Sequence, residues 1–136
     1  MNDQFQNTAT ATAFNLADFE ARDTAWLDVQ SIKGDGPLVV NGQPVRIEIR
    51  SPGTREALNA QHKLETASNA RTFAAMRGKA VKETVETKQG EKADKLTAVT
   101  ARIENFPVPA HELYSNPKLG WITAQVVEFH ADWANF

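Results

Sequence analysis

The chain has 136 residues, enough for one domain with a hydrophobic core and too few for two ordinary domains. Hydrophobic residues make up 41% and charged residues 24%, which is typical of a globular protein and excludes a wholly disordered one. The net charge of −2 gives no overall attraction to nucleic acid or to an anionic membrane. The lack of cysteine excludes disulfides and thiolate zinc sites, and no stretch approaches the roughly 18 apolar residues of a membrane span.

The N-terminal residues are polar and alternate threonine with alanine, so they have little apolar surface to bury. They also lack the basic start and apolar centre of a signal peptide, and we expect residues 1–13 to form a flexible arm. Phe14 to Phe19 is a short amphipathic piece of about one helical turn. We expect residues 14–136 to form a single α+β domain, with the strands first and the helices after them.

The β-forming residues lie in three stretches that are separated by turn signals. These stretches run from Trp26 to Ile32, from Leu38 to Val40 and from Val45 to Arg50. Asn41-Gly42 supplies the two positive φ angles of a tight hairpin, and strict alternation after it places Val45, Ile47 and Ile49 on one face. The pattern predicts a small three-stranded antiparallel meander over residues 25–50.

A long helix is expected after the strands. Ser51 or Thr54 caps its N-terminus, and it either runs for about 30 residues or bends at Gly78. Its apolar side is a narrow stripe of small residues, which lets another helix approach closely but buries little area. We therefore expect this helix to need partners and the protein to self-associate weakly, through this stripe or through the C-terminal face described below.

Residues 77–95 are mostly polar, and pairs such as Glu91 and Lys95 at i, i+4 indicate a solvated helix. We expect Gly90 to break it. Leu96, Val99 and Ile103 then follow at helical spacing, although Thr97, Val99 and Thr100 also suit a strand. We favour a helix here.

The C-terminal residues predict an amphipathic helix that begins near Pro117, after a short helical turn at 110–115. Its apolar positions recur at spacings of four and three, which places them on one face. Trp121 precedes these positions, and we include it in what we call the C-terminal face. We interpret this face as a candidate protein-interaction site. The same pattern fits a helix that closes the core of its own domain equally well. The residues of the face are Trp121, Ile122, Val126, Phe129, Trp133 and Phe136.

The sequence lacks the usual constellations of an enzyme. None of its serines lies in a Gly-x-Ser-x-Gly elbow, and no glycine-rich phosphate loop is present. We interpret His62, His111 and His130 as structural or solvent-facing rather than as metal ligands, and the lysines of residues 79–95 alternate with carboxylates and have no aromatic neighbours. We expect no catalytic, cofactor or metal site and no nucleic-acid partner.

The C-terminus also resembles a known family. Gly120-Trp121-Ile122, Gln125-Val126, Phe129, Asp132 and Asn135-Phe136 resemble the C-terminal signature of tail assembly chaperones from tailed bacteriophages and prophages. The expected hairpin, the entry to the long helix and the positions of Arg71 and Phe73 on that helix also fit this pattern.

The resemblance implies a non-enzymatic chaperone in the host bacterial cytoplasm that binds the tape measure protein before the tail tube polymerises around it. It also implies contacts among copies of the chaperone, with the tail tube protein as a further candidate partner. The alternative is a structural component of the virion, such as a minor tail or tail completion protein.

Overall fold

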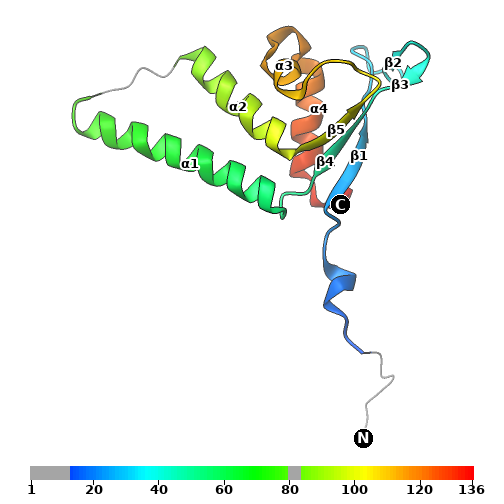
Figure 1. The fold of residues 1–136 in the computed structure, drawn as a ribbon, viewed down its shortest axis with the longest axis horizontal. Coiled ribbons are helices and arrows are strands. Elements are labelled where there is room, and N and C mark those ends of the chain that lie inside the picture. The colour runs from blue at the N-terminus through cyan, green and yellow to red at the C-terminus, as the bar shows by residue number, and fades with distance from the viewer. Residues whose placement is uncertain (1–12, 80–83) are drawn as a thin grey trace, which may run out of the picture.

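The computed structural model describes residues 13–79 and 84–136. The expected N-terminal arm, residues 1–13, lies outside these ranges except for Ala13. Figure 1 shows a small sheet with helices beside it and a short N-terminal segment that projects from the body. The α+β class is confirmed, since the described chain combines one three-stranded antiparallel sheet with four α-helices.

The main sheet has the order β1-β4-β5, with both pairs antiparallel. Its strands are β1 (Thr24–Asp28), β4 (Arg46–Arg50) and β5 (Thr100–Glu104). The expected meander over residues 25–50 is therefore wrong in its middle strand, because residues 38–40 do not join this sheet and β5, which follows the first two α-helices, supplies its third strand. Residues 38–40 instead enter a separate two-stranded ribbon, β2 (Val39–Val40) with β3 (Gln43–Pro44).

The hairpin itself is confirmed, because Asn41 and Gly42 have φ angles of 51° and 77°. This tight turn pairs Val39 with Pro44, and the Val45 N–H continues the pairing by donating to the Leu38 carbonyl at 2.9 Å. The Leu38 N–H donates instead to the Val29 carbonyl at 2.8 Å, so the ribbon ends there and β4 pairs with β1 and β5.

The two faces of β4 differ as the alternation predicted. Val45, Ile47 and Ile49 are buried. On the opposite face Glu48 accepts hydrogen bonds from the Thr24 hydroxyl at 2.8 Å and from Arg102 at 3.0 Å. The pKa of Glu48 is lowered, mainly by the Thr24 hydrogen bond and further by Arg102, although burial acts in the opposite direction. This outer face is thus a network of paired charges.

The long helix α1 (Arg55–Met76) begins as predicted, since the Thr54 side chain accepts a hydrogen bond from the Ala57 N–H. It ends just before Gly78, whose φ of +73° is the left-handed conformation that terminates helices. Of the two alternatives, a continuous helix of about 30 residues is wrong. The chain turns at Gly78, and α2 (Val85–Val99) then packs against α1.

Three expectations for the polar stretch need correction. Gly90 lies inside α2 and does not break it, because one interior glycine costs only about 1 kcal/mol. Glu91 pairs with Arg71 of α1 at 2.6 Å, and Lys95 donates to Gln61, so these side chains join two helices. The predicted helix over Leu96–Ile103 changes to strand at Thr100, where pairing with β4 begins. The other i, i+4 pairs expected in this stretch, Lys79 with Glu83 and Lys82 with Glu86, each include a residue outside the described ranges.

The remaining helices are α3 (Ala110–Ser115) and α4 (Gly120–Ala131), joined by a 3-10 turn at Pro117–Leu119. Both helices were predicted. The C-terminal helix stops at Ala131, however, because Asp132 is extended and its side chain caps a 3-10 turn at Trp133–Asn135. The hydrophobic core lies between the sheet, α2, α3 and α4 and includes Ile47, Leu96, Leu113 and Val126.

Candidate protein-interaction surfaces

The C-terminal face is divided by the structure. Ile122 and Val126 are 1% and 0% exposed and belong to the core. Trp121, Phe129 and Phe136 are half-buried against that core. Phe129 and Phe136 meet edge to face with ring centroids 5.6 Å apart, so this part of the face closes the chain's own domain.

Trp133 is the exception, with 56% of its surface exposed. The break at Asp132 rotates it out of the helical stripe, and its ring lies over Gly53 in the loop that enters α1. A Cβ atom on Gly53 would lie 3.3 Å from the tryptophan ring. The prediction that the C-terminal face binds a partner stays a prediction, and Trp133 is the residue of this face that offers most surface for it.

Specific contacts fix the C-terminus to the body. The Arg22 backbone N–H donates to the Phe136 carbonyl at 3.0 Å, and its guanidinium donates to the carbonyls of Asn135 and Phe136 at 3.2 Å. Asn135 donates from its side chain to the Phe129 carbonyl. These bonds hold the base of the N-terminal segment and the chain end together.

Helix α1 carries a second apolar face that the sequence reasoning missed. At about 100° per residue, its half-buried positions point to one side, where Arg71 reaches Glu91 of α2. The large exposed side chains Leu58, Phe73 and Met76 point to the opposite side. Leu58 and Met76 are about five turns apart and therefore aligned. The spacing of these residues in the sequence indicates this outer face of α1. The prediction from sequence instead used the more numerous alanines, which lie on the inner side.

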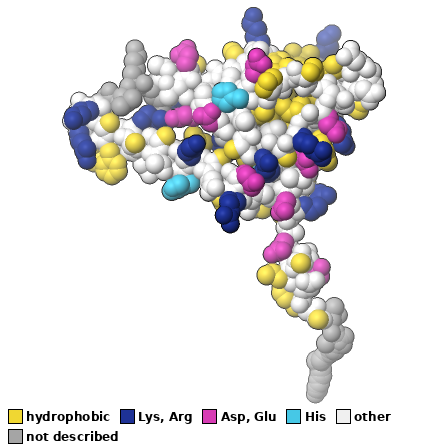
Figure 2. All heavy atoms as spheres, viewed as in Figure 1, with side chains coloured by type: hydrophobic (Ala, Val, Ile, Leu, Met, Phe, Trp, Pro, Cys, Tyr) yellow, Lys and Arg dark blue, Asp and Glu magenta, His cyan; other side chains and the backbone are white. Residues whose placement is uncertain are grey.

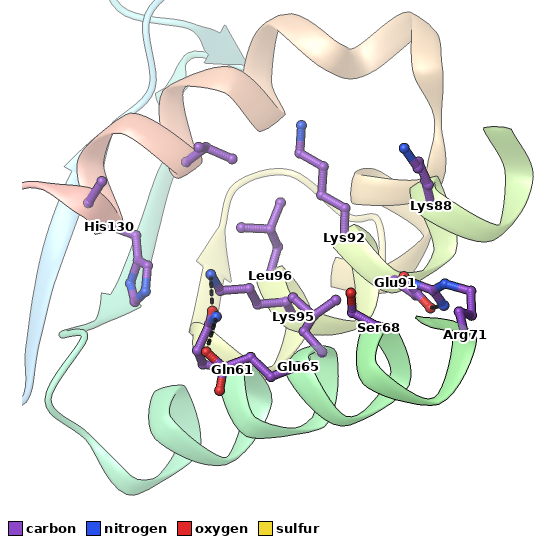
Figure 3. Close-up of a pocket in the computed structure, with 13 residues that line it drawn as sticks. Gln61, Glu65, Ser68, Arg71, Lys88, Glu91, Lys92, Lys95, Leu96 and His130 are labelled. Carbon is purple, nitrogen blue, oxygen red and sulfur yellow. Dashed lines mark hydrogen bonds and ion pairs between the residues drawn. The ribbon is translucent and has the colours of Figure 1, made fainter. Parts of the chain in front are cut away.

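A groove of about 540 Å³ lies between α1, α2 and α4, as Figure 3 shows. Its apolar lining includes Leu64 of α1, Leu96 of α2 and Val127 of α4. Leu96 lies between the side chains of Lys92 and Lys95 in the close-up. A groove of this size is within the range that buries several side chains of a ligand.

The groove is basic. Its walls carry four cationic side chains, Arg71, Lys88, Lys92 and Lys95, against two carboxylates, Glu65 and Glu91. Arg71 and Glu91 form an ion pair, and Lys95 donates a hydrogen bond to the Gln61 side chain at 2.9 Å. His130 also lines the groove. Burial lowers its pKa, the hydrogen bond to the Arg50 carbonyl raises it, and nearby Lys95 lowers it, with a net decrease.

The N-terminal segment, residues 14–20, is the third exposed apolar feature. It contains a 3-10 turn at Leu16–Phe19 and extends away from the body, and Figure 2 shows apolar atoms along it. Phe14, Leu16 and Phe19 are 75%, 62% and 74% exposed. The two phenylalanine rings stack with centroids 5.4 Å apart. The expectation of one helical turn here is confirmed.

The histidines occupy separate places. His62 is exposed on α1, His111 bonds Asp94 at 2.8 Å, and His130 donates from Nδ1 to the Arg50 carbonyl. Within residues 13–79 and 84–136, no three histidine or acidic side chains gather closely enough to hold a metal ion. No helix of the described chain is long and apolar enough to cross a membrane.

The chain matches no model of a known protein family, no curated protein and no solved structure. The resemblance to tail assembly chaperones therefore rests on the residues of this sequence.

Proposed function

We propose that this protein is a tail assembly chaperone that binds helical segments of a phage tape measure protein and performs no chemistry. The observation that supports this proposal most is the outer face of α1, where Leu58, Phe73 and Met76 stand exposed on a helix already packed on its other side. Phe73 and Met76, at i and i+3, would contact one turn of a partner helix, and Leu58 would contact a turn farther along it.

The apolar residues of this face lie at its two ends. Leu58 is at one end, Met76 is about 27 Å away at the other beside Phe73, and the exposed polar residues His62, Glu65 and Asn69 lie between them on the same side. Trp133 lies near the N-terminal end of α1, because its ring contacts Gly53 in the loop before the helix. Large exposed aromatic and aliphatic side chains in such an arrangement are typical anchors of protein interfaces.

Co-expression with the tape measure protein encoded in the same genome tests the proposal. We expect the chaperone to increase the soluble fraction of the tape measure protein and to form a complex with it on size exclusion. The Leu58→Ser/Met76→Ser variant should lose the complex while its melting temperature changes little, since both side chains are already in water. The Phe14→Ser/Phe19→Ser variant also loses two exposed apolar side chains and should keep the complex.

Two results would contradict the proposal. One is binding that persists unchanged when both Leu58 and Met76 are replaced. The other is the presence of this protein in purified virions at a fixed stoichiometry, which would favour the alternative of a minor tail or tail completion protein. Contact with the tail tube protein would be tested by the same co-expression with that subunit.

A further inference from the structure

We propose that the free edge of strand β1, together with the adjacent side of α4, binds an extended basic segment of another protein as an added β-strand. The segment is about five residues long, at about 3.4 Å per residue, and alternates apolar residues with polar ones that include lysine or arginine. This site is distinct from the outer face of α1. The inference does not rest on the proposed function, and its test needs no tape measure protein.

The edge of β1 is available for pairing at alternate residues. Strand β1 lies at one side of the sheet, whose order is β1-β4-β5. Just after β1, the Val29 N–H donates to the Val45 carbonyl at 3.1 Å, so the odd-numbered residues of this stretch face β4. In an antiparallel ladder the intervening residues direct their N–H and C=O groups to the other side. Thr24, Trp26 and Asp28 therefore present their backbone groups at the free edge.

The chain itself pairs this edge at both of its ends. At one end the Gln30 N–H donates to the Gln125 side-chain oxygen at 2.8 Å, and the Gln125 side-chain nitrogen donates to the Gln30 carbonyl at 3.0 Å. This amide bonds the edge as the peptide group of a neighbouring strand does. At the other end the Arg22 N–H donates to the Phe136 carbonyl at 3.0 Å. Between these ends, no group within residues 13–79 and 84–136 accepts from the three N–H groups at the edge.

A pocket of about 630 Å³ lies beside this edge. Leu27 and Asp28 line one wall, and Trp121, Gln125 and Phe129 of α4 line the other. Side chains of an added strand alternate between the two faces of the sheet, as those of β1 do. A residue opposite Leu27 would therefore point toward α4, where the pocket offers aromatic surface. Apolar residues suit these positions of the bound segment.

The charges of the pocket favour a basic segment. It contains three carboxylates, Asp28, Glu128 and Asp132, against a single lysine, Lys33. Asp28 and Glu128 are exposed, so they are accessible to a partner. Lysine or arginine at the ends of the bound segment would meet this acidic rim, and an acidic segment would be repelled.

A second copy of the protein is a poorer occupant of the same edge. Pairing of β1 with β1 of another copy about a two-fold axis would bring two acidic pockets together, and like charges repel. Charged side chains on an edge strand, such as Asp28 here, are a common protection against self-pairing. The edge thus disfavours its own copy and remains open to a basic partner.

The test uses the full chain and a fluorescent peptide with blocked ends, Lys-Val-Thr-Val-Lys, in an anisotropy titration. In an antiparallel register the central threonine lies opposite Trp26, and the two valines lie opposite Leu27 and Ala25. Methylation of the threonine nitrogen removes an N–H that points to β1, and should raise the dissociation constant at least about tenfold. Methylation of the nitrogen of the first valine is the matched control. That N–H points to solvent, so binding should change little.

Two protein variants test the acidic rim. Asp28→Asn/Glu128→Gln should weaken binding about threefold or more, since each exposed charge pair contributes a few tenths of a kcal/mol. Asp18→Asn/Glu20→Gln removes the same charge from the N-terminal segment, which extends away from the body in Figure 1, and should bind like the unchanged protein. All four side chains are exposed, so the melting temperatures should match. Added salt should weaken binding, because surface charges are screened.

Hydrogen exchange locates the bound peptide. Exchange of the Trp26 N–H should slow on binding, while exchange of the Arg22 and Gln30 N–H groups, which are already bonded, should change little. The inference is overturned if the peptide does not bind at concentrations up to about 1 mM, or if the two methylated peptides bind equally well. It is also overturned if the Trp26 N–H becomes protected by rising protein concentration without peptide, which would assign the edge to a second copy.

Discussion

Replacing Ile122 by alanine is expected to destabilise the fold more than replacing Trp133 by alanine, although tryptophan is the larger side chain. Ile122 is 1% exposed in the core, and its truncation removes three carbon atoms at about 0.8 kcal/mol each. The cavity left in a close-packed core adds a further cost, so the total is about 3–4 kcal/mol. Trp133 keeps more than half of its surface in water, and its truncation opens no closed cavity. We expect a loss of about 1–2 kcal/mol there.

Thermal unfolding followed by circular dichroism measures this difference. For a chain of 136 residues, an unfolding entropy of about 2.1 cal/mol/K per residue makes 1 kcal/mol equal to about 3.5 °C in melting temperature. The expected decreases are therefore about 10–14 °C for Ile122→Ala and about 4–7 °C for Trp133→Ala. A larger decrease for Trp133→Ala would refute the division of the C-terminal face at Asp132.

Three further outcomes follow from single positions. Thr123→Val should raise stability by about 1 kcal/mol in urea denaturation, because the buried Thr123 hydroxyl has no hydrogen-bond partner among the described residues. Gly90→Ala should raise the stability by about 0.5–1 kcal/mol, because a Cβ atom at this position meets nothing within 4 Å and alanine favours the helix. A decrease in stability would show that the fold needs glycine at this position. The folded-state pKa of His130 lies below its ordinary value of 6.5, so the unfolded state binds more protons as the pH falls through 6.5. Stability should therefore decrease over that range in the unchanged protein, and His130→Gln should remove this part of the pH dependence.

Several local features were predictable because their signals act over a few residues. Asn41-Gly42 determines a hairpin through its own backbone angles, and Thr54 caps α1 through a side chain that reaches three residues ahead. The alternation of Val45, Ile47 and Ile49 was enough to identify the buried face of β4. Gly78 was predicted as a point where the helix could bend, and in the structure α1 ends just before this glycine, which has a positive φ.

The tertiary structure decided what depends on distant residues. Thr100–Glu104 is a strand because β4, about 50 residues earlier in the chain, has a free edge with which Ile103 can pair. The local spacing of Leu96, Val99 and Ile103 predicts a helix and cannot indicate a partner so far away in the sequence. Glu91 and Lys95 were expected to pair along one helix, but α1 lies close enough for Arg71 and Gln61 to bind them. The spacing of apolar residues at the C-terminus likewise placed Trp133 and Ile122 on the same face of one helix. A short capping interaction at Asp132 separated them, and only the packing of α4 determined which side chains are buried.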